Sequence, residues 1–139
     1  MIDLDLGLAL REAGLTWKPA AGDRFMVLDR DLEDQVFVLS DMVIETRETP
    51  SGPLLAFNGT TEWALDSLEV QDAVWLPRED QLRELLGESF VSLEVAGGGD
   101  VPGAFAVTVR VAGADRRHIE VTAAAAYARA LLDLLADPA

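Results

Sequence analysis

The spacing of apolar residues changes along this chain, and that change constrains the fold more than any other feature of the sequence. Three segments, 4–13, 77–87 and 123–136, carry apolar residues at helical spacing. The runs between them are short and apolar and are broken by Gly, Pro and Asn, which is typical of antiparallel strands. The pattern predicts an α+β fold, an antiparallel sheet with three helices in the order α–β(3–4)–α–β(2–3)–α.

The ends of the first helix carry recognisable capping residues. Asp3 precedes the apolar run and is expected to cap its N-terminus. Gly14 can adopt the left-handed conformation that ends a helix, and Leu15 and Leu10 then occupy the positions of the apolar contact in a Schellman motif.

The second and third helices are marked in the same way. Pro77 is expected at the first position of the second helix, which Gly87 ends, and Thr122 is expected to cap the third. The residues expected on their buried sides are Leu82, Leu85 and Leu86 in the second helix and Tyr127, Leu131, Leu134 and Leu135 in the third.

The strands of the first half are less sharply defined. A strand is expected over 24–28, and the β-rich run 35–48 is either one long bent strand or two short ones. Its start, 36–39, is apolar on both faces, as in a central strand. Asn58-Gly59 predicts a two-residue hairpin that pairs Leu55 with Glu62 and Leu54 with Trp63.

The last hairpin has two competing registers. A three-residue loop over 113–115 pairs Val109 with Ile119 and Val107 with Val121, whereas a two-residue loop sets the same valines against His118 and Glu120. A slip of one residue moves every side chain to the other face. The apolar pairing therefore favours the three-residue loop.

Length and composition predict one domain over residues 1–139. Half of the residues are apolar and there is no cysteine, so a hydrophobic core must hold the fold without disulfides. The N-terminal residues Met1–Asp5 carry acid where a signal peptide carries Lys or Arg, and no apolar run approaches the length of a membrane span. The expected location is the cytoplasm.

The net charge of −14, from 25 acidic and 11 basic residues, limits the partners. Nucleic acids and anionic membranes are disfavoured because this chain would repel their phosphates. A basic protein or a cation is the charged partner that fits, although the same charge also serves solubility.

Residues that could carry chemistry are sparse, so no catalytic residue, cofactor or metal site is predicted. His118 is the single histidine, and without cysteines it cannot complete a transition-metal site; beside Arg110, Arg116 and Glu120 it is expected to be solvated. The acidic run 29–34 lacks the glycine and glutamate that a calcium loop needs. The glycines at 97–99 lack the lysine and helix of a P-loop.

The three tryptophans are the candidate partner-binding residues. Trp17 and Trp75 lie near prolines at the boundaries of predicted elements, and Trp63 lies on the predicted hairpin. Core packing is the more common explanation of such residues. The functional interpretation is an apolar patch at which a partner docks, because aromatic side chains dominate binding hot spots.

The segments 22–25, 57–66 and 75–82 together resemble a family of small acidic actinobacterial proteins, whose members sometimes carry a pilus-assembly label. The likeness covers about the first 90 residues and implies no established activity. In element order and acidity alone, the chain is also similar to class I type III secretion chaperones, which are small acidic α+β dimers that hold an unfolded client segment.

These observations favour a non-enzymatic protein-binding domain, chaperone- or adaptor-like, with a protein partner and with a homodimeric state as an open alternative. One alternative is an acidic immunity or inhibitor protein that neutralises a basic enzyme. The other is an enzyme with an unrecognised carboxylate site.

Overall fold

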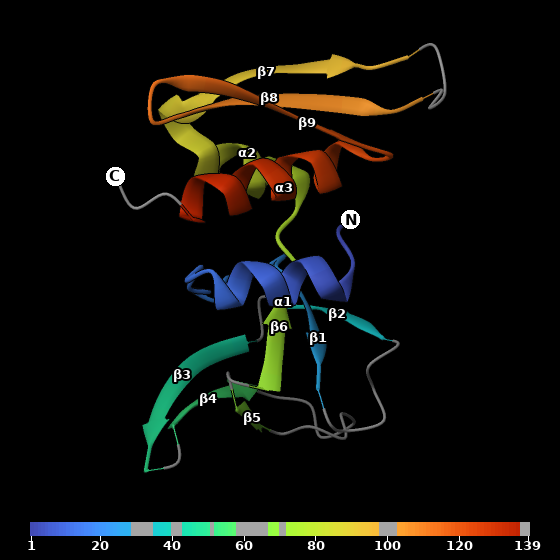
Figure 1. Cartoon of the computed structure of the whole chain (residues 1–139). Coiled ribbons are helices and arrows are strands. Elements are labelled where there is room, and N and C mark those ends of the chain that lie inside the picture. The colour runs from blue at the N-terminus through green and yellow to red at the C-terminus, as the bar shows by residue number, and fades with distance from the viewer. Residues whose placement is uncertain are drawn as a thin grey trace. The chain divides into compact units, whose positions relative to one another are not determined.

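The computed structural model describes residues 1–28, 35–39, 43–50, 52–57, 67–69, 72–97 and 103–136, and for 43–49, 52–57 and 67–69 it describes the backbone alone. The elements in chain order are α1 (Leu4–Glu12), β1 (Arg24–Val27), β2 (Val36–Val38), β3 (Val43–Thr49), β4 (Gly52–Phe57), β5 (Ser67–Glu69), β6 (Ala73–Trp75), α2 (Glu79–Leu86), the 3-10 turn η2 (Gly87–Ser89), β7 (Phe90–Val95), β8 (Phe105–Val111), β9 (Ala114–Glu120) and α3 (Ala123–Ala136) (Figure 1).

The predicted α+β class is confirmed. All strand pairs in the described residues are antiparallel, and they form three sheets of three strands in the orders β2-β1-β6, β3-β4-β5 and β7-β8-β9. The first run of strands comprises six short strands, and the second comprises three. The chain divides into two compact units, a terminal unit of residues 1–16 and 77–139 and a central unit of residues 17–76. The expectation of a single domain over 1–139 stays a prediction.

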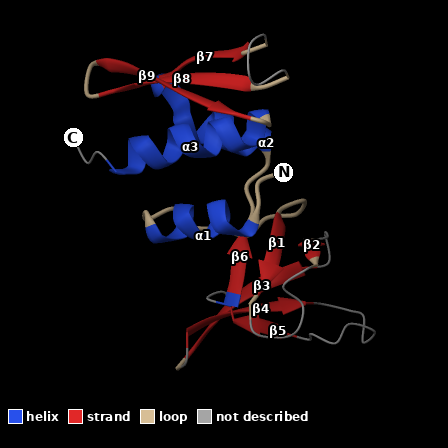
Figure 2. Ribbon diagram, turned by 45° about the vertical axis from the view of Figure 1, so that its right-hand side comes forward, coloured by secondary structure: helices blue, strands red, loops and turns tan. Residues whose placement is uncertain are grey.

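In the terminal unit α2 and α3 lie on one face of the sheet β7-β8-β9, and α1 packs against α3 (Figure 2). Helix α3 contacts β8, β9, α2 and α1. A helix with neighbours on several sides must be apolar on several sides, and α3 meets this condition with small side chains. Its buried residues are Ala124, Ala126, Tyr127, Ala128, Ala130 and Leu131. Leu134 and Leu135, which were expected in the core, are only half-buried, because the alanines occupy the closest contacts.

The predicted ends of α1 are confirmed. Asp3 Oδ1 accepts a hydrogen bond from the N–H of Leu6 at 2.9 Å. At the other end Gly14 has φ of 106°, and the N–H groups of Leu15 and Gly14 bond to the carbonyls of Leu10 and Arg11. These two bonds are those of a Schellman motif.

Thr122 caps α3 as expected, because its Oγ1 accepts from the N–H of Ala125 at 3.1 Å. Two expectations for α2 were wrong. The helix begins at Glu79, with Arg78 rather than Pro77 at its start, and the N–H of Arg78 donates to Gln81 Oε1 at 2.9 Å. Leu85 is exposed, because only Leu82 and Leu86 of this short helix face the core.

Both registers considered for the last hairpin were wrong. Val111 pairs with Ala114, so the loop is Ala112-Gly113, and both residues have positive φ, as a type I′ turn requires. This register sets Val107 opposite His118 and Val109 opposite Arg116. Apolar matching failed because α3 supplies polar partners to this side of β9.

In the central unit the run 35–48 is two strands, and they belong to different sheets. Strand β2 lies at an edge of its sheet rather than in the centre, and Val36 and Val38 are exposed. In β4, Leu54 pairs with Glu69 and Leu55 with Leu68, so the predicted pairings of these two leucines with Trp63 and Glu62 were wrong. Asn58-Gly59, Trp63 and the acidic run 29–34 lie outside the described residues.

Candidate functional site: the edges of the β7-β8-β9 sheet

Strand β7 presents unpaired backbone groups at one edge of its sheet. In the described part of the chain its only strand neighbour is β8. The N–H of Ala96 bonds to the carbonyl of Ala104 at 2.8 Å, and hydrogen-bonded pairs recur at every second residue of an antiparallel ladder, so Ser92 and Glu94 also face β8. The N–H and C=O groups of Leu93 and Val95 therefore point away from β8.

The side chains of this free edge are apolar and exposed. Leu93 is opposite Val107 and Val95 is opposite Phe105, so both lie on the helix side of the sheet. Even so, 39% of Leu93 and 72% of Val95 remain accessible. Phe90, at the start of the strand, is covered: its ring lies 6.0 Å from that of Tyr127, and the Arg83 guanidinium lies 3.6 Å from its centroid. The uncovered part of β7 is therefore its second half.

A β-bulge separates these two halves. The register of the β7–β8 ladder shifts between Phe90 and Ser92, which places Val91 in the bulge. Pairing is regular from Ser92 to Val95, which corresponds to about 13 Å of strand. A regular segment of this length can accept one short additional strand.

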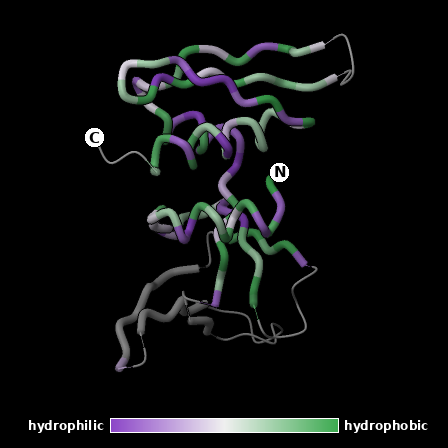
Figure 3. Tube along the Cα trace, in the orientation of Figure 1, coloured by the Kyte–Doolittle hydropathy of each residue, from purple (hydrophilic) through white to green (hydrophobic). Residues whose placement is uncertain are grey.

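Strand β9 forms the other edge of the same sheet, and most of its residues are hydrophilic (Figure 3). The residues whose backbone groups point outward include Asp115 and Arg117, and both side chains are exposed. Asp115 accepts a hydrogen bond from Arg110 Nε at 2.9 Å, and this bond raises the pKa of Arg110. Charged residues of this kind are a common protection of an edge strand against further pairing.

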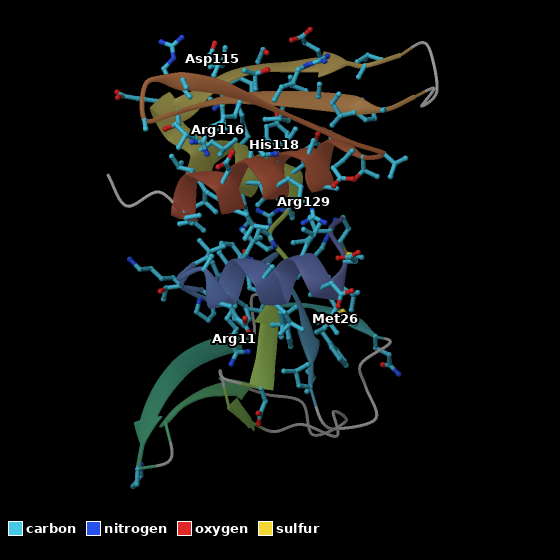
Figure 4. All side chains as sticks on the ribbon, in the orientation of Figure 1. Arg11, Met26, Asp115, Arg116, His118 and Arg129 are labelled. Atoms are coloured by element: carbon cyan, nitrogen blue, oxygen red, sulfur yellow. The ribbon has the colours of Figure 1, made fainter. Side chains whose placement is uncertain are left out.

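On the helix side, Arg116 and His118 of β9 lie next to α3 (Figure 4), and ion pairs fasten the strand to that helix. Asp133 of α3 binds both Arg116 and His118, the latter with 3.0 Å between Nε2 and Oδ2. Arg129 Nε lies 3.0 Å from Glu120 Oε1. The expectation that His118 is a solvated side chain was wrong, since register and helix together place it against Asp133.

The chemistry of this cluster is that of a structural clamp. A histidine oriented by a carboxylate is also part of hydrolase triads, which require a nucleophile at the second ring nitrogen. Among the described residues the ring bonds to Asp133 alone, and Arg116 binds the other oxygen of that carboxylate. Nothing among the described residues completes a catalytic triad here.

The central unit gathers aromatic residues on one face of the β2-β1-β6 sheet. Phe25 pairs with Phe37 on one side and with Trp75 on the other, so the three rings share a face. The ring centroids of Phe25 and Phe37 are 5.5 Å apart, and those of Phe25 and Trp17 are 5.6 Å apart.

Asp23 holds this cluster's loop in place. It is 2% exposed, and its Oδ2 accepts hydrogen bonds from Trp17 Nε1 at 2.9 Å and from the N–H of Ala20 at 3.0 Å. Trp17 and Trp75 are both half-buried, and Trp75 Nε1 is buried without a partner among the described residues. A partner-binding role for Trp17, Trp63 and Trp75 stays a prediction.

The sequence did not single out two carboxylates that organise these sites, Asp23 and Asp133. Asp133 did carry a signal: it is the one acidic residue within the apolar segment 123–136, which follows a strand rich in basic residues. An acidic side chain on a mostly apolar helix is expected to have a partner. Asp23 lies in an ordinary loop sequence and carries no comparable signal.

Two searches of the described residues were negative. No group of three or more His, Cys, Asp or Glu side chains is placed to hold a metal ion in the described part of the chain. Among the helices described, none has the length and apolar character needed to cross a membrane.

The chain was also compared with known proteins. Comparisons with protein-family models, with curated proteins and with solved structures found no match.

Proposed function

We propose that this chain is a non-enzymatic, cytoplasmic protein-binding domain, chaperone- or adaptor-like, which takes up a segment of a partner protein as an additional strand beside β7. The proposal rests on the outward backbone groups and the exposed side chains of Leu93 and Val95. Their backbone groups point outward from the sheet, and their side chains are exposed. Strand addition uses these two features: main-chain hydrogen bonds give affinity, and alternate side chains give specificity.

The class of ligand follows from the same edge. A row of backbone N–H and C=O groups at strand spacing matches another extended polypeptide and no other common class of ligand. The charge of −14 supports a protein rather than a nucleic acid or an anionic membrane. No catalytic residue, cofactor or metal takes part in the proposal.

The uneven charge of the chain favours a second candidate, an acidic inhibitor of a basic enzyme. Residues 17–76 contain 12 acidic and four basic residues. An inhibitor of this kind would use that charge to accelerate association, so its complex would weaken steeply with added salt. Strand addition differs because it depends on backbone hydrogen bonds and apolar contacts at β7.

The proposal is tested with two matched variants. Val95→Lys places a charge at the open edge, whereas Val121→Lys, just past β9 and 67% exposed, serves as the control. Each protein is used to capture partners, and hydrogen exchange of the β7 amides is measured with and without the captured partner. We expect partners that Val95→Lys loses and Val121→Lys retains, and we expect protection of the Leu93 and Val95 amides in the complex.

Identical partner sets for the two variants would contradict the proposal, as would a complex in which the Leu93 and Val95 amides still exchange freely. A complex that Val95→Lys leaves intact but moderate salt dissolves would support the acidic inhibitor instead.

A further inference from the structure

The pairing geometry of β7 specifies which side chains an added strand would carry. The backbone N–H and C=O groups of Leu93 and Val95 point outward from the sheet. In an added antiparallel strand, the residues opposite these two would form hydrogen-bonded pairs with them, and their side chains would lie on the helix side of the sheet. Glu94 lies on the opposite face, and its partner in the added strand would form a non-hydrogen-bonded pair, in which side chains are closest.

The helix side of an added strand must be apolar. Leu93 and Val95 are the exposed apolar side chains there, and Val91 in the bulge is a third, with 44% of its surface accessible. Cross-strand pairs of β-branched or leucine side chains would remove this surface from water.

On its opposite face, next to Glu94, the added strand should carry a basic residue. In the described part of the chain, the Glu94 carboxylate accepts a hydrogen bond from the neighbouring Ser92 hydroxyl at 3.1 Å and has no charged partner. The nearest strand partner of Glu94 is Ala106, and the residue beyond that, on β9, is Ile119. No cation of the sheet is therefore in the row of Glu94, and a Lys or Arg in an added strand would be its first charged partner.

The net charge of the chain also favours a basic partner. The terminal unit contains 13 acidic and seven basic residues, a net charge of −6, and the full chain has −14. A basic segment is attracted by this field during approach, whereas a second copy of the chain is repelled.

We propose that the strand taken up by β7 is an extended, basic segment of another protein in which apolar residues, placed opposite Leu93 and Val95, alternate with Lys or Arg, one of which pairs with Glu94. This inference rests on the proposed function. It adds the chemical class of the partner to the position at which that partner binds.

The probes are four synthetic peptides of equal length. Three alternate Val with Lys, with Thr or with Glu, and the fourth has the composition of the Val–Lys peptide in an order without alternation. Binding is measured by fluorescence anisotropy with the full chain. We expect the order Lys, then Thr, then Glu, with about tenfold or more between the Lys and Glu peptides, and no binding of the non-alternating peptide.

Variants locate the effect at the edge. Val95→Lys should weaken the Val–Lys peptide by about tenfold or more, and Val121→Lys should leave it unchanged. Glu94→Gln should weaken the Val–Lys peptide by a few-fold while leaving the Val–Thr peptide unchanged.

The failures of the two proposals are distinguishable. If the Thr or Glu peptide binds β7 as tightly as the Lys peptide, the edge binds strands and the basic specificity is wrong. If no peptide binds and the Leu93 and Val95 amides are never protected, strand addition itself is wrong. A dimer of the chain alone that Val95→Lys dissolves would also overturn the inference, because a second copy would then occupy the edge.

Discussion

Strands β7 and β9 are the two edges of one sheet, and the sequence treats them differently. In β9, five of the seven residues are charged or histidine, and the side that faces α3 is fastened to it by Asp133. In β7 only Glu94 is charged, and Leu93 and Val95 are exposed beside backbone groups that point away from β8. The comparison shows that an acidic surface does not by itself protect a sheet edge against pairing with another strand. Protection depends on which positions of the edge strand carry the charge.

Removal of the ion pairs that fasten β9 to α3 should cause the largest loss of stability. Asp133→Ala leaves Arg116 and His118 without the carboxylate that both contact. We expect a loss of about 2 kcal/mol in the free energy of unfolding, because hydrogen bonds to charged groups are among the stronger ones. Urea denaturation measures it, and Asp133→Asn, which retains one acceptor, should lose less. Unchanged stability in both variants would mean that the clamp does not hold β9.

The second largest effect, a gain of self-association, should come from a substitution that makes the edge of β9 resemble that of β7. Arg117→Val replaces an outward charge and continues the apolar surface of Ile119, which is already 49% exposed. We expect self-association through β9, with about 1 kcal/mol for each cross-strand pair formed. Sedimentation velocity over a wide concentration range measures it, with Arg117→Gln as the polar control. If the Val variant sediments like the Gln variant, outward charge is not what keeps this edge free.

A smaller loss of stability is expected from removal of the exposed ion pair between β9 and α3. Arg129 and Glu120 form an ion pair in which half of the Arg129 side chain is exposed. Arg129→Ala should therefore lose less than about 0.5 kcal/mol, since solvent screens such pairs. Equal losses from Arg129→Ala and Asp133→Ala in the same denaturation series would remove the distinction between the two ends of the clamp.

The smallest change at neutral pH should come from Tyr127→Phe, at the covered end of β7. Burial raises the pKa of Tyr127. The folded chain therefore keeps its phenol proton above pH 10 while the unfolded chain loses it, so wild-type stability is complete below about pH 10 and falls as the pH rises further.

The phenylalanine variant should lack this alkaline decrease, as denaturation at neutral and alkaline pH would show. Tyr127 is the single tyrosine of the chain, so its absorbance reports the titration directly. A decrease of equal size in the phenylalanine variant would assign it to other groups.

Local patterns predicted the parts of the fold that depend on neighbours in the sequence. Asp3, Gly14 and Thr122 perform the capping roles expected of them, because a cap involves only a few consecutive residues. That β7 is an edge could not be predicted, since the order of strands depends on contacts between distant segments.

The pairing of β8 with β9 shows where such reasoning stops. Matching valine to isoleucine is sound when one face of a sheet meets an apolar layer. Here the face that carries Val107 and Val109 also carries His118 and Arg116, because α3 presents alanines to one strand and Asp133 to the next. Nothing within the two strands encodes that helix, so the register and the clamp were both missed.

The alanines of α3 limit which changes the chain can accept. A helix that meets its neighbours through single methyl groups sits at a separation set by backbone atoms, and even one extra methylene must displace a neighbouring element. Substitutions that diversify binding should therefore accumulate along β7 and almost never at the buried alanines Ala124, Ala126, Ala128 and Ala130. A library randomised over both segments and selected for folded protein would show this difference as a contrast in accepted side-chain volume.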